Sequence, residues 1–407
     1  MRALGSKTIQ FRESSTMRGH CPAGPAAPGM AAPPLRILFD LKHPAHYHFF
    51  RHVMAALRRD GHSLTITCRK SPTLISLLDA GGLPYQIVST KGKGILGLAR
   101  ELLLRDWALY RIARKVRPDV LVAKHGLCIS HVGTILRIPS LSYEDTEHAK
   151  LQIRLSWPFL TRILTDHSYL IDAGKKHRRL NLLNALAYLH PHHFAPNPTI
   201  LHEVGLSRDE PYVVVRFVAW DAAHDIPARR SRDAQRRRLV AELAKHARVL
   251  VVPEKTLPAD LEQHVPKFPP HRFHDLLAFA AAHVGEGGSV AAEAAVLGVP
   301  TVYTNPLGGG CLDELIGRGL CRWETDPEKA LSVAKEWLKR PTQIRALFEQ
   351  KRKRLLLEKG DPVRLLAEQV VLLGREGRTS ARRKNSAHAT AAGGGSSSSI
   401  SPGTDGF

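Results

Sequence analysis

The sequence predicts an α/β protein made of two doubly wound halves, each with a parallel sheet covered by helices. Short apolar runs alternate with amphipathic stretches along most of the chain, which is typical of successive βαβ units. The length of 407 residues fits two domains at roughly 150 residues each. A Pro- and His-rich stretch, His190–Pro198, separates two series of this alternation and is the expected linker.

The first series supplies five strands and three helices. The strands are predicted at Arg36–Leu41, Ser63–Cys68, Tyr85–Val88, Val120–Ala123 and Ser140–Tyr143. The helices are predicted at Ala45–Arg59, Thr73–Ala80 and Ile95–Val116, the last of them long and amphipathic. Gly61 ends the first helix, and the third stops ahead of Pro118, because proline cannot continue a helix.

The second series repeats the pattern after the linker. Its strands are predicted at Tyr212–Val215, Val249–Val252, His283–Gly285 and Thr301–Thr304. Its helices are predicted at Ser231–Lys245, His274–Ala280 and Ser289–Leu297. Two such halves leave a cleft between them, and ligands of doubly wound sheets bind beyond the carboxyl ends of the strands.

Both ends of the chain lack periodicity and are expected to be disordered. Residues 1–34 mix Gly, Pro, Ala and Ser, and the segment from about Gly374 runs into Gly393–Gly395 and Ser396–Ser399. The expected domains are therefore 35–195 and 196–373, flanked by tails at 1–34 and 374–407.

The composition favours a cytoplasmic protein without a membrane span. Five cysteines form no CxxC pair, which argues against a disulfide framework or a cysteine zinc site. No run approaches the ~18 apolar residues of a membrane helix. The net charge of +22 fits either a solvated Arg-rich surface or affinity for nucleotide phosphates, acidic lipid or nucleic acid. The Arg-rich run Arg229–Arg238 is interpreted either as a solvated helix face or as a segment that lies on the acidic inner face of a membrane.

A glycine-rich turn opens the last predicted helix. Gly287 and Gly288 allow close backbone approach to a ligand, and Ser289 is a preferred N-cap residue. Free N–H groups at a helix start suit a phosphate. Glu293, one turn later on the same face, could accept both hydroxyls of a ribose. The alternative is an ordinary turn whose glutamate complements the helix dipole.

Histidines cluster where the first strand meets the first helix, between Asp40 and Phe50. The helix dipole disfavours the charged form of a histidine at this place, so His46 could stay neutral and act as a base. His48 and His52 have zinc-ligand spacing, but no HExxH pattern or third ligand accompanies them. Neither a metal nor a cofactor is therefore expected.

Two further polar clusters follow predicted strands. They are Tyr143–His148, which includes Asp145 and His148, and Trp220–Asp225, which includes His224. Either could position a histidine, hold a sugar hydroxyl or bind a cation, or it could be solvated loop polarity. Arg216 ends a strand nearby and could contact a phosphate. The chain has no Walker A, GxGxxG, GxSxG or RNA-recognition aromatic signature.

Taken together, these segments resemble a family of archaeal and bacterial proteins that carries a domain-of-unknown-function label and is described as predicted glycosyltransferases. The resemblance covers about residues 35–372. It rests on Asp40–Phe50, Asp145–Ala149, Leu189–Pro191, Arg216–Asp225 and Glu293–Gly298. The family is in turn similar to the GT-B superfamily, which includes the lipid II-forming N-acetylglucosaminyltransferase and the non-hydrolysing UDP-N-acetylglucosamine 2-epimerases.

This resemblance implies two Rossmann-like domains facing each other across a cleft. Residues 35–195 would bind an acceptor and residues 196–373 a nucleotide sugar. His46 would be the base, oriented by Asp145 or Asp40. The implied substrate-binding residues are Arg216, Gly287, Gly288, Ser289, Glu293, His43, His148, Trp220, His224 and Asp225. His43-Pro44-Ala45 stands where the lipid II enzyme has a Gly-rich loop, which leaves the acceptor and the base open.

The predicted function is transfer of a sugar from a nucleoside-diphosphate donor, UDP-linked by the resemblance, to an unidentified glycan, lipid or small molecule, without a bound metal. One alternative is a UDP-sugar 2-epimerase of the same fold. Another is a non-catalytic binder of anions or nucleic acid, which the lack of interleaved aromatic residues disfavours.

Overall fold

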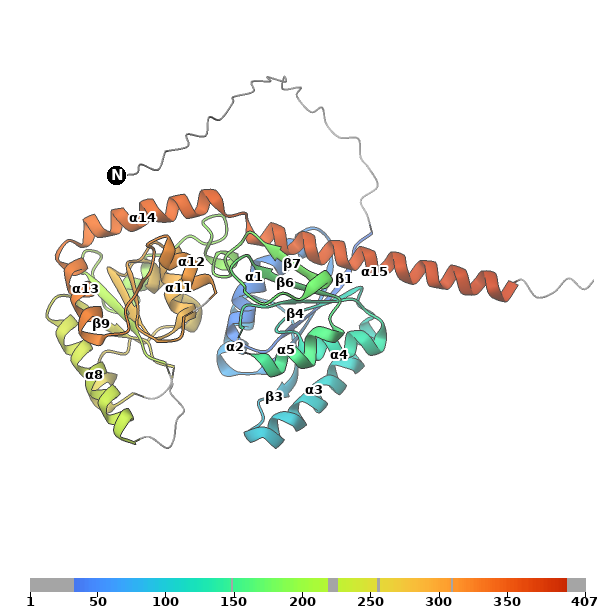
Figure 1. The fold of residues 1–407 in the computed structure, drawn as a ribbon, viewed down its shortest axis with the longest axis horizontal. Coiled ribbons are helices and arrows are strands. Elements are labelled where there is room, and N and C mark those ends of the chain that lie inside the picture. Colours follow the sequence, from blue (N-terminus) through green and yellow to red (C-terminus); the bar gives the residue numbers. More distant parts are fainter. Residues whose placement is uncertain (1–32, 148, 219–225, 255–256, 309, 394–407) are drawn as a thin grey trace, which may run out of the picture. The chain divides into compact units, whose positions relative to one another are not determined.

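Two parallel β-sheets organise the chain, and helices pack against both (Figure 1). The computed structural model describes residues 33–147, 149–218, 226–254, 257–308 and 310–393, with the side chains of 226–232 and 381–393 left out. From Pro34 on, the described residues belong to one compact unit.

Within the described residues, the first sheet has seven strands in the order β3-β2-β1-β4-β5-β6-β7. These are β1 (Arg36–Leu41), β2 (Ser63–Lys70), β3 (Gln86–Thr90), β4 (Val120–Lys124), β5 (Ser140–Tyr143), β6 (Arg162–Asp166) and β7 (His177–Leu180). All pairs are parallel, and Phe39 lies between Ile66 and Val122. The sequence predicts β1 to β5, and continuous apolar runs mark β1 and β4 among them. It misses β6, although that strand is buried, and β7, which is mostly basic.

The helices of this half are α1 (Pro44–Arg59), α2 (Pro72–Ala80), α3 (Gly94–Val116), α4 (Leu127–Leu136), α5 (Lys150–Ser156) and α6 (Leu186–Leu189), with 3-10 turns at Trp157–Phe159 and Gly174–Lys176. The imidazole of His43 caps α1, because its Nδ1 accepts the N–H of Ala45 at 3.2 Å. Pro44 occupies the first helical position, where the missing N–H has no intrahelical partner to lose.

The second sheet has the order β12-β11-β10-β8-β9 within the part of the chain that is described. Its strands are β8 (Tyr212–Arg216), β9 (Arg248–Val251), β10 (Ala282–Gly285), β11 (Thr301–Tyr303) and β12 (Arg322–Trp323). Its helices are α7 (Thr199–Glu203), α8 (Ile226–Ala244), α9 (Ala259–Glu262), α10 (Phe273–Ala278), α11 (Gly288–Val296), α12 (Cys311–Gly317), α13 (Pro327–Lys339) and α14 (Pro341–Glu358), with a 3-10 turn at Pro270–Arg272. The strand order reverses between β8 and β10, the place where such sheets bind ligands.

The C-terminal segment differs from the disordered tail expected at 374–407. Helix α15 spans Pro362–Gly393 and packs against α1, β4 and α6 of the first half (Figure 1). Arg378 bonds Asp119 at 2.6 Å across that contact. Gly374 and Gly377, which read as flexible in the sequence, are points of close approach: a Cβ at Gly377 would lie 2.6 Å from the Cγ of Pro139. The folded body therefore extends beyond 373, and its last helix returns to the first half.

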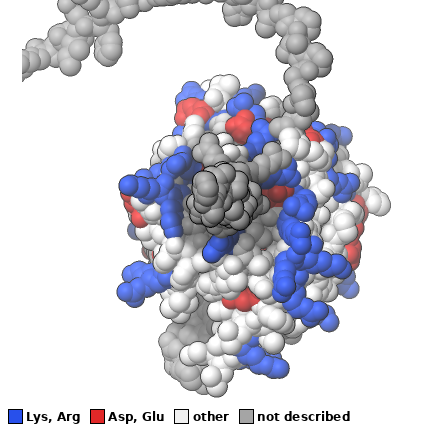
Figure 2. All heavy atoms as spheres, turned by 90° about the vertical axis from the view of Figure 1, so that its right-hand side faces the viewer, with Lys and Arg blue, Asp and Glu red and all other residues white. Residues whose placement is uncertain are grey.

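The surface is strongly basic, as the net charge of +22 requires. Figure 2 shows one such face, on which Lys and Arg gather in several patches and Asp and Glu are sparse. None of the described helices is long and apolar enough to cross a membrane.

Candidate functional site

A cavity of about 280 Å³ lies between the carboxyl edges of the two sheets and is lined by residues of both halves. Lys124 and Asp166 end β4 and β6, and Asp145 follows β5. From the second half come Gly288 and Ser289, at the start of α11. Because the carboxyl ends of parallel strands carry the ligand sites of doubly wound folds, we place the candidate site here.

A larger cavity of about 400 Å³ lies in the second half alone, beside α8 and α13. Its lining is mainly apolar, and its arginine, Arg236, is bonded to Glu286 at 2.6 Å. It brings together fewer ionisable groups than the smaller cavity, so we do not assign the chemistry to it.

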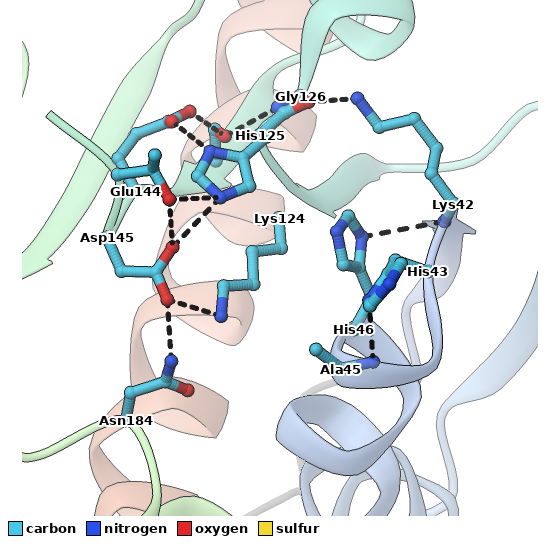
Figure 3. A network of polar contacts seen from close by, with 12 residues as sticks. Lys42, His43, Ala45, His46, Lys124, His125, Gly126, Glu144, Asp145 and Asn184 are labelled. Carbon is cyan, nitrogen blue, oxygen red and sulfur yellow. Dashed lines mark hydrogen bonds and ion pairs between the residues drawn. The ribbon is translucent and has the colours of Figure 1, made fainter. Parts of the chain in front are cut away.

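His125 is the centre of a polar network at the edge of the first sheet (Figure 3). Its Nδ1 lies 2.8 Å from Glu144 Oε2, and its Nε2 lies 2.9 Å from Asp145 Oδ1. Burial alone would lower the pKa of His125, but hydrogen bonds to Asp145 and Glu144 outweigh burial and raise it. The imidazolium form is therefore favoured.

Asp145 joins this network to the cavity. Its Oδ2 accepts hydrogen bonds from Lys124 Nζ at 2.5 Å and Asn184 Nδ2 at 2.6 Å (Figure 3). Burial would raise the pKa of Asp145, but the charge of Lys124 and the bond to His125 lower it strongly. Asp145 is thus a fixed anion that holds two cations in place.

The backbone at His125 is itself unusual. This residue has a φ of 54°, in the left-handed region that non-glycine residues seldom adopt. Its N–H donates to the carbonyl of Tyr143 at 3.1 Å, and its own carbonyl accepts from Lys42 Nζ at 2.6 Å. Such conformations persist where the surroundings hold them, and they concentrate at functional sites.

His46 lies beside this network, with its ring 6.0 Å from that of His125. It is buried, and burial together with the cations Lys42 and Lys124 holds its pKa well below the usual range. Its Nδ1 faces the backbone N–H of Lys42 at 3.5 Å, so Nε2 carries the proton in this arrangement (Figure 3). His43, the other predicted histidine, is exposed at the same corner.

The two carboxylates expected to orient His46 are bonded elsewhere. Asp145 contacts Lys124, His125 and Asn184, as described above. Asp40 accepts from Arg105 at 2.6 Å and from Thr67 at 2.8 Å, and the side chains of Asp40 and Arg105 are each 2% exposed. The predicted pairing is therefore corrected: His46 is oriented by a backbone N–H, and Asp40 belongs to a buried ion pair.

On the second half, the glycine-rich turn has a different cap from the predicted one. Helix α11 begins at Gly288 with Gly287 as its N-cap, so Ser289 lies inside the first turn. No side chain of the described residues caps this helix. Its first N–H groups are therefore available to a ligand at the cavity wall.

Glu293 faces the cavity from α11. Its Oε1 accepts the hydroxyl of Tyr188 at 2.6 Å and lies 3.4 Å from His274 Nε2. Burial would raise the pKa of Glu293, but the charge of His274 and these hydrogen bonds lower it. Glu293 is thus an oriented carboxylate one turn from the helix start.

Arg216 ends β8 beside the same turn, since a Cβ at Gly287 would lie 3.5 Å from its Cγ. Its guanidinium donates to the carbonyls of Val252 and Pro253, each at 3.2 Å, and to Glu254. Arg216 does not line the cavity. The remaining predicted site residues lie outside the described residues: His148, Trp220, His224 and Asp225.

Several cavity residues escaped the sequence reasoning. They are Lys124, Asp166, Asn184 and Tyr188. Burial raises the pKa of Asp166, and one of its oxygens accepts from both the N–H and the hydroxyl of Ser168. A search for polar residues at every strand end would have found Lys124, and would have found Asp166 had β6 been predicted. In the parts of the chain that are described, no group of three His, Cys, Asp or Glu side chains is arranged to hold a metal.

Comparison with known proteins gives a family match and an archaeal relative. The family model "Protein of unknown function (DUF354)" matches residues 35–373. The uncharacterized protein MJ0665 of Methanocaldococcus jannaschii is 24% identical over 286 residues, which are 67% of this chain and 82% of that protein.

Two solved structures show the fold type. The UDP-GlcNAc 2-epimerase of Neisseria meningitidis, bound to UDP-GlcNAc, has a TM-score of 0.58 at 12% identity, over 83% of this chain and 99% of that one. The glycosyltransferase SsfS6 of Streptomyces sp. SF2575, complexed with thymidine diphosphate, has a TM-score of 0.54 at 16% identity, over 82% and 99%. The chain has the GT-B fold, with two Rossmann-like halves, and at these identities the likeness shows the fold alone.

Proposed function

The chain belongs to the family described as Protein of unknown function (DUF354), and we propose that it is an enzyme acting on a nucleoside-diphosphate sugar, in the first place a glycosyltransferase. One observation carries this proposal. A single cavity joins the uncapped start of α11 to the cationic network around Lys124 and His125. Such a cavity can hold a diphosphate at one wall and a sugar at the other.

The start of α11 is the proposed donor site. Its free N–H groups and the positive end of the helix dipole favour the diphosphate. Glu293 would accept the ribose hydroxyls, one turn further on. The bound UDP-GlcNAc and thymidine diphosphate of the two similar structures support a nucleoside diphosphate as the ligand class. We propose a UDP sugar as the first donor to test.

The edge of the first sheet presents hydrogen-bond donors to the cavity. Lys124 is held there by Asp145, and Asn184 lies beside it. Lys124, together with the start of α11, would stabilise the negative charge that develops on the leaving diphosphate. Arg216 would add to this from beside the turn, once released from Glu254. These groups are the basis for proposing a reaction that needs no divalent cation.

Two groups are candidates for proton exchange with the acceptor hydroxyl: Asp166 lines the cavity, and His46 is buried beside it, outside the lining. We propose His46, whose lowered pKa keeps it neutral; it must act through the tautomer that frees Nε2. Asp166 is the comparison, because it lines the cavity and burial raises its pKa. The expected result is that His46→Ala abolishes turnover and preserves UDP affinity, whereas Asp166→Asn reduces turnover less.

The test is nucleoside-diphosphate release from UDP-GlcNAc, UDP-glucose, GDP-mannose and dTDP-glucose, with UDP affinity measured by calorimetry. A loss of UDP binding in a folded His46→Ala variant would place His46 in the donor site instead. Turnover unchanged in that variant would remove it from the proton transfer.

A second candidate is the epimerase chemistry of the same fold. The observation that favours it is that ionisable groups line the cavity on both sides, Asp166 and Glu293 among them. These groups could act on the donor sugar itself, and rearranging that sugar needs no acceptor. Proton NMR of UDP-GlcNAc incubated with the enzyme alone separates the two. A new signal of an epimerised sugar would indicate epimerisation. Slow release of UDP with a sugar of unchanged configuration, or an unchanged donor, would leave the transferase.

A further inference from the structure

Helix α3 turns charged side chains inward and large apolar side chains outward. Its buried line consists of Glu101, Arg105, Leu109 and Ala113, spaced four residues apart. On the opposite side, the exposed fractions of Leu96, Leu103 and Trp107 are 87%, 71% and 60%. A helix on the surface of a soluble domain normally has the reverse arrangement.

The inward charges have specific partners, which explains how this orientation is held. Arg105 pairs with Asp40, and its other terminal nitrogen donates to Ser89 at 2.7 Å. Glu101 accepts from Arg69 at 2.7 Å and from the N–H of Gly92 at 2.9 Å. Leaving any of these buried ions unpaired costs several kcal/mol. The outward direction of the apolar side chains is therefore fixed by the ion pairs beneath them.

The outer face carries arginine as well as apolar side chains. Arg100, Arg111 and Arg114 are exposed and alternate with Leu96, Leu103 and Trp107 at spacings of three and four residues, so all six share one stripe. The two carboxylates of the helix are engaged: Glu101 is buried, and Asp106 bonds His131 of α4 at 2.7 Å. The stripe is therefore apolar and positively charged.

Exposed apolar and basic side chains continue from α3 onto α5 and the 3-10 turn that follows α5. His131 of α4 connects α3 to α5 and to the 3-10 turn Trp157–Phe159. Its Nε2 lies 3.4 Å from the carbonyl of Leu155, and its ring packs 5.9 Å from that of Phe159. Leu151, Leu155 and Phe159 are exposed there, next to exposed Lys150 and Arg154.

We propose that this stripe of α3 docks on the surface of an anionic lipid bilayer. Leucine and tryptophan side chains enter the interface, and the arginines contact the headgroups. A second copy of the chain fits less well, because a two-fold interface would bring identical basic stripes together with no exposed carboxylate of α3 between them. Docking does not depend on the proposed enzymatic function.

The test is co-sedimentation of the full chain with vesicles of phosphatidylglycerol and phosphatidylcholine, and with vesicles of phosphatidylcholine alone. We expect binding to the anionic vesicles only. Leu103→Ser/Trp107→Ser should weaken it at least tenfold, whereas the matched pair Leu347→Ser/Leu357→Ser on α14, also exposed, should stay within twofold of wild type. Replacing the three stripe arginines by glutamine should lower affinity by roughly fivefold per residue.

Circular dichroism melts check that each variant folds, and light scattering after size exclusion reports the oligomeric state. Wild-type affinity in the Leu103→Ser/Trp107→Ser variant would overturn the proposal, and so would equal binding to both vesicle types. A dimer that this variant converts to monomer, without vesicle binding, would assign the stripe to a second copy and overturn lipid docking.

Discussion

The two walls of the cavity use different chemistry. The wall from the first sheet presents charged side chains: Lys124 is held by Asp145, which is itself held from behind by His125. The wall from the second sheet presents backbone N–H groups at the start of α11, with Glu293 beside a neutral tyrosine hydroxyl. A backbone site suits a constant group such as a diphosphate, and a side-chain site suits the groups that differ between substrates.

The two walls also differ in the part of the structure that supports them. The first is backed by buried ion pairs such as Asp40–Arg105, so its geometry depends on charges beneath the surface. The second is backed by the aliphatic core around α11, which includes Ala291 and Val296. We therefore expect substitutions in or behind the first wall to lower stability and turnover, and substitutions in the second wall to lower donor affinity.

The largest expected effect is on stability. Arg105→Met leaves Asp40 buried without its cation and should lower the free energy of unfolding by about 3–5 kcal/mol. Arg238→Met removes an exposed ion pair with Glu328 and should cost less than about 1 kcal/mol. Urea denaturation measures both. The double variant Asp40→Leu/Arg105→Met should recover much of the loss, and failure to recover any would mean that packing, not charge, sets the cost.

The next effect is on turnover. Lys124→Met should reduce nucleoside-diphosphate release by about 10²–10³-fold, since it removes a cation placed for the developing charge. Lys339→Met, on exposed α13, is the matched control and should leave the rate unchanged. If both variants keep full activity, the first wall is not the reacting side of the cavity.

A smaller effect is expected on donor affinity. Glu293→Ala should weaken UDP binding by roughly 10–100-fold, because hydrogen bonds to a charged group contribute about 1.5–3 kcal/mol. Tyr188→Phe should weaken it less, since it removes only one of the two partners that orient the carboxylate and leaves His274 in place. Calorimetry with UDP gives both values, and unchanged affinity in Glu293→Ala would take this residue out of the ribose contact.

The smallest effect is a pH dependence that distinguishes the ionised wall. The raised pKa of His125 means that the folded chain binds this proton more tightly than the unfolded chain. Its contribution to stability is therefore complete below about pH 6.5 and is lost as the pH rises through the folded value. Asp145, with a lowered pKa, loses its contribution in acid instead. His125→Gln should flatten the loss of stability as the pH rises above about 6.5, and an unchanged slope would contradict this.

The sequence predicts the architecture and half of the site. Continuous apolar runs reveal buried strands. The rule that ligands lie beyond strand ends selects Asp145, and the glycine-rich turn selects Glu293; both line the cavity, whereas His46 lies beside it. Lys124 was passed over as an ordinary residue after an apolar run. Asn184 and Tyr188 come from a stretch without periodicity and reach the cavity only through tertiary folding.

Two further features were hidden for physical reasons. Gly374 and Gly377 have the composition of a flexible tail, because their close packing against distant residues, Leu35 for Gly374 and Pro139 for Gly377, leaves no local signal. The amphipathic pattern of α3 identifies a helix but not which face is buried. Asp40 holds Arg105 inward and Arg69 holds Glu101 inward, and these two partners lie on β1 and β2, far from α3 in the sequence.

The most direct test is a thermal-unfolding shift of the full chain with UDP, GDP, CDP, dTDP and a short RNA, repeated with Glu293→Ala. Ligand at ~100 times its dissociation constant adds about 2.7 kcal/mol, a shift of several degrees. We predict that one diphosphate, first of all UDP, raises the midpoint and that Glu293→Ala removes the shift. A shift with RNA alone that salt abolishes, with no response to any diphosphate, would contradict this prediction.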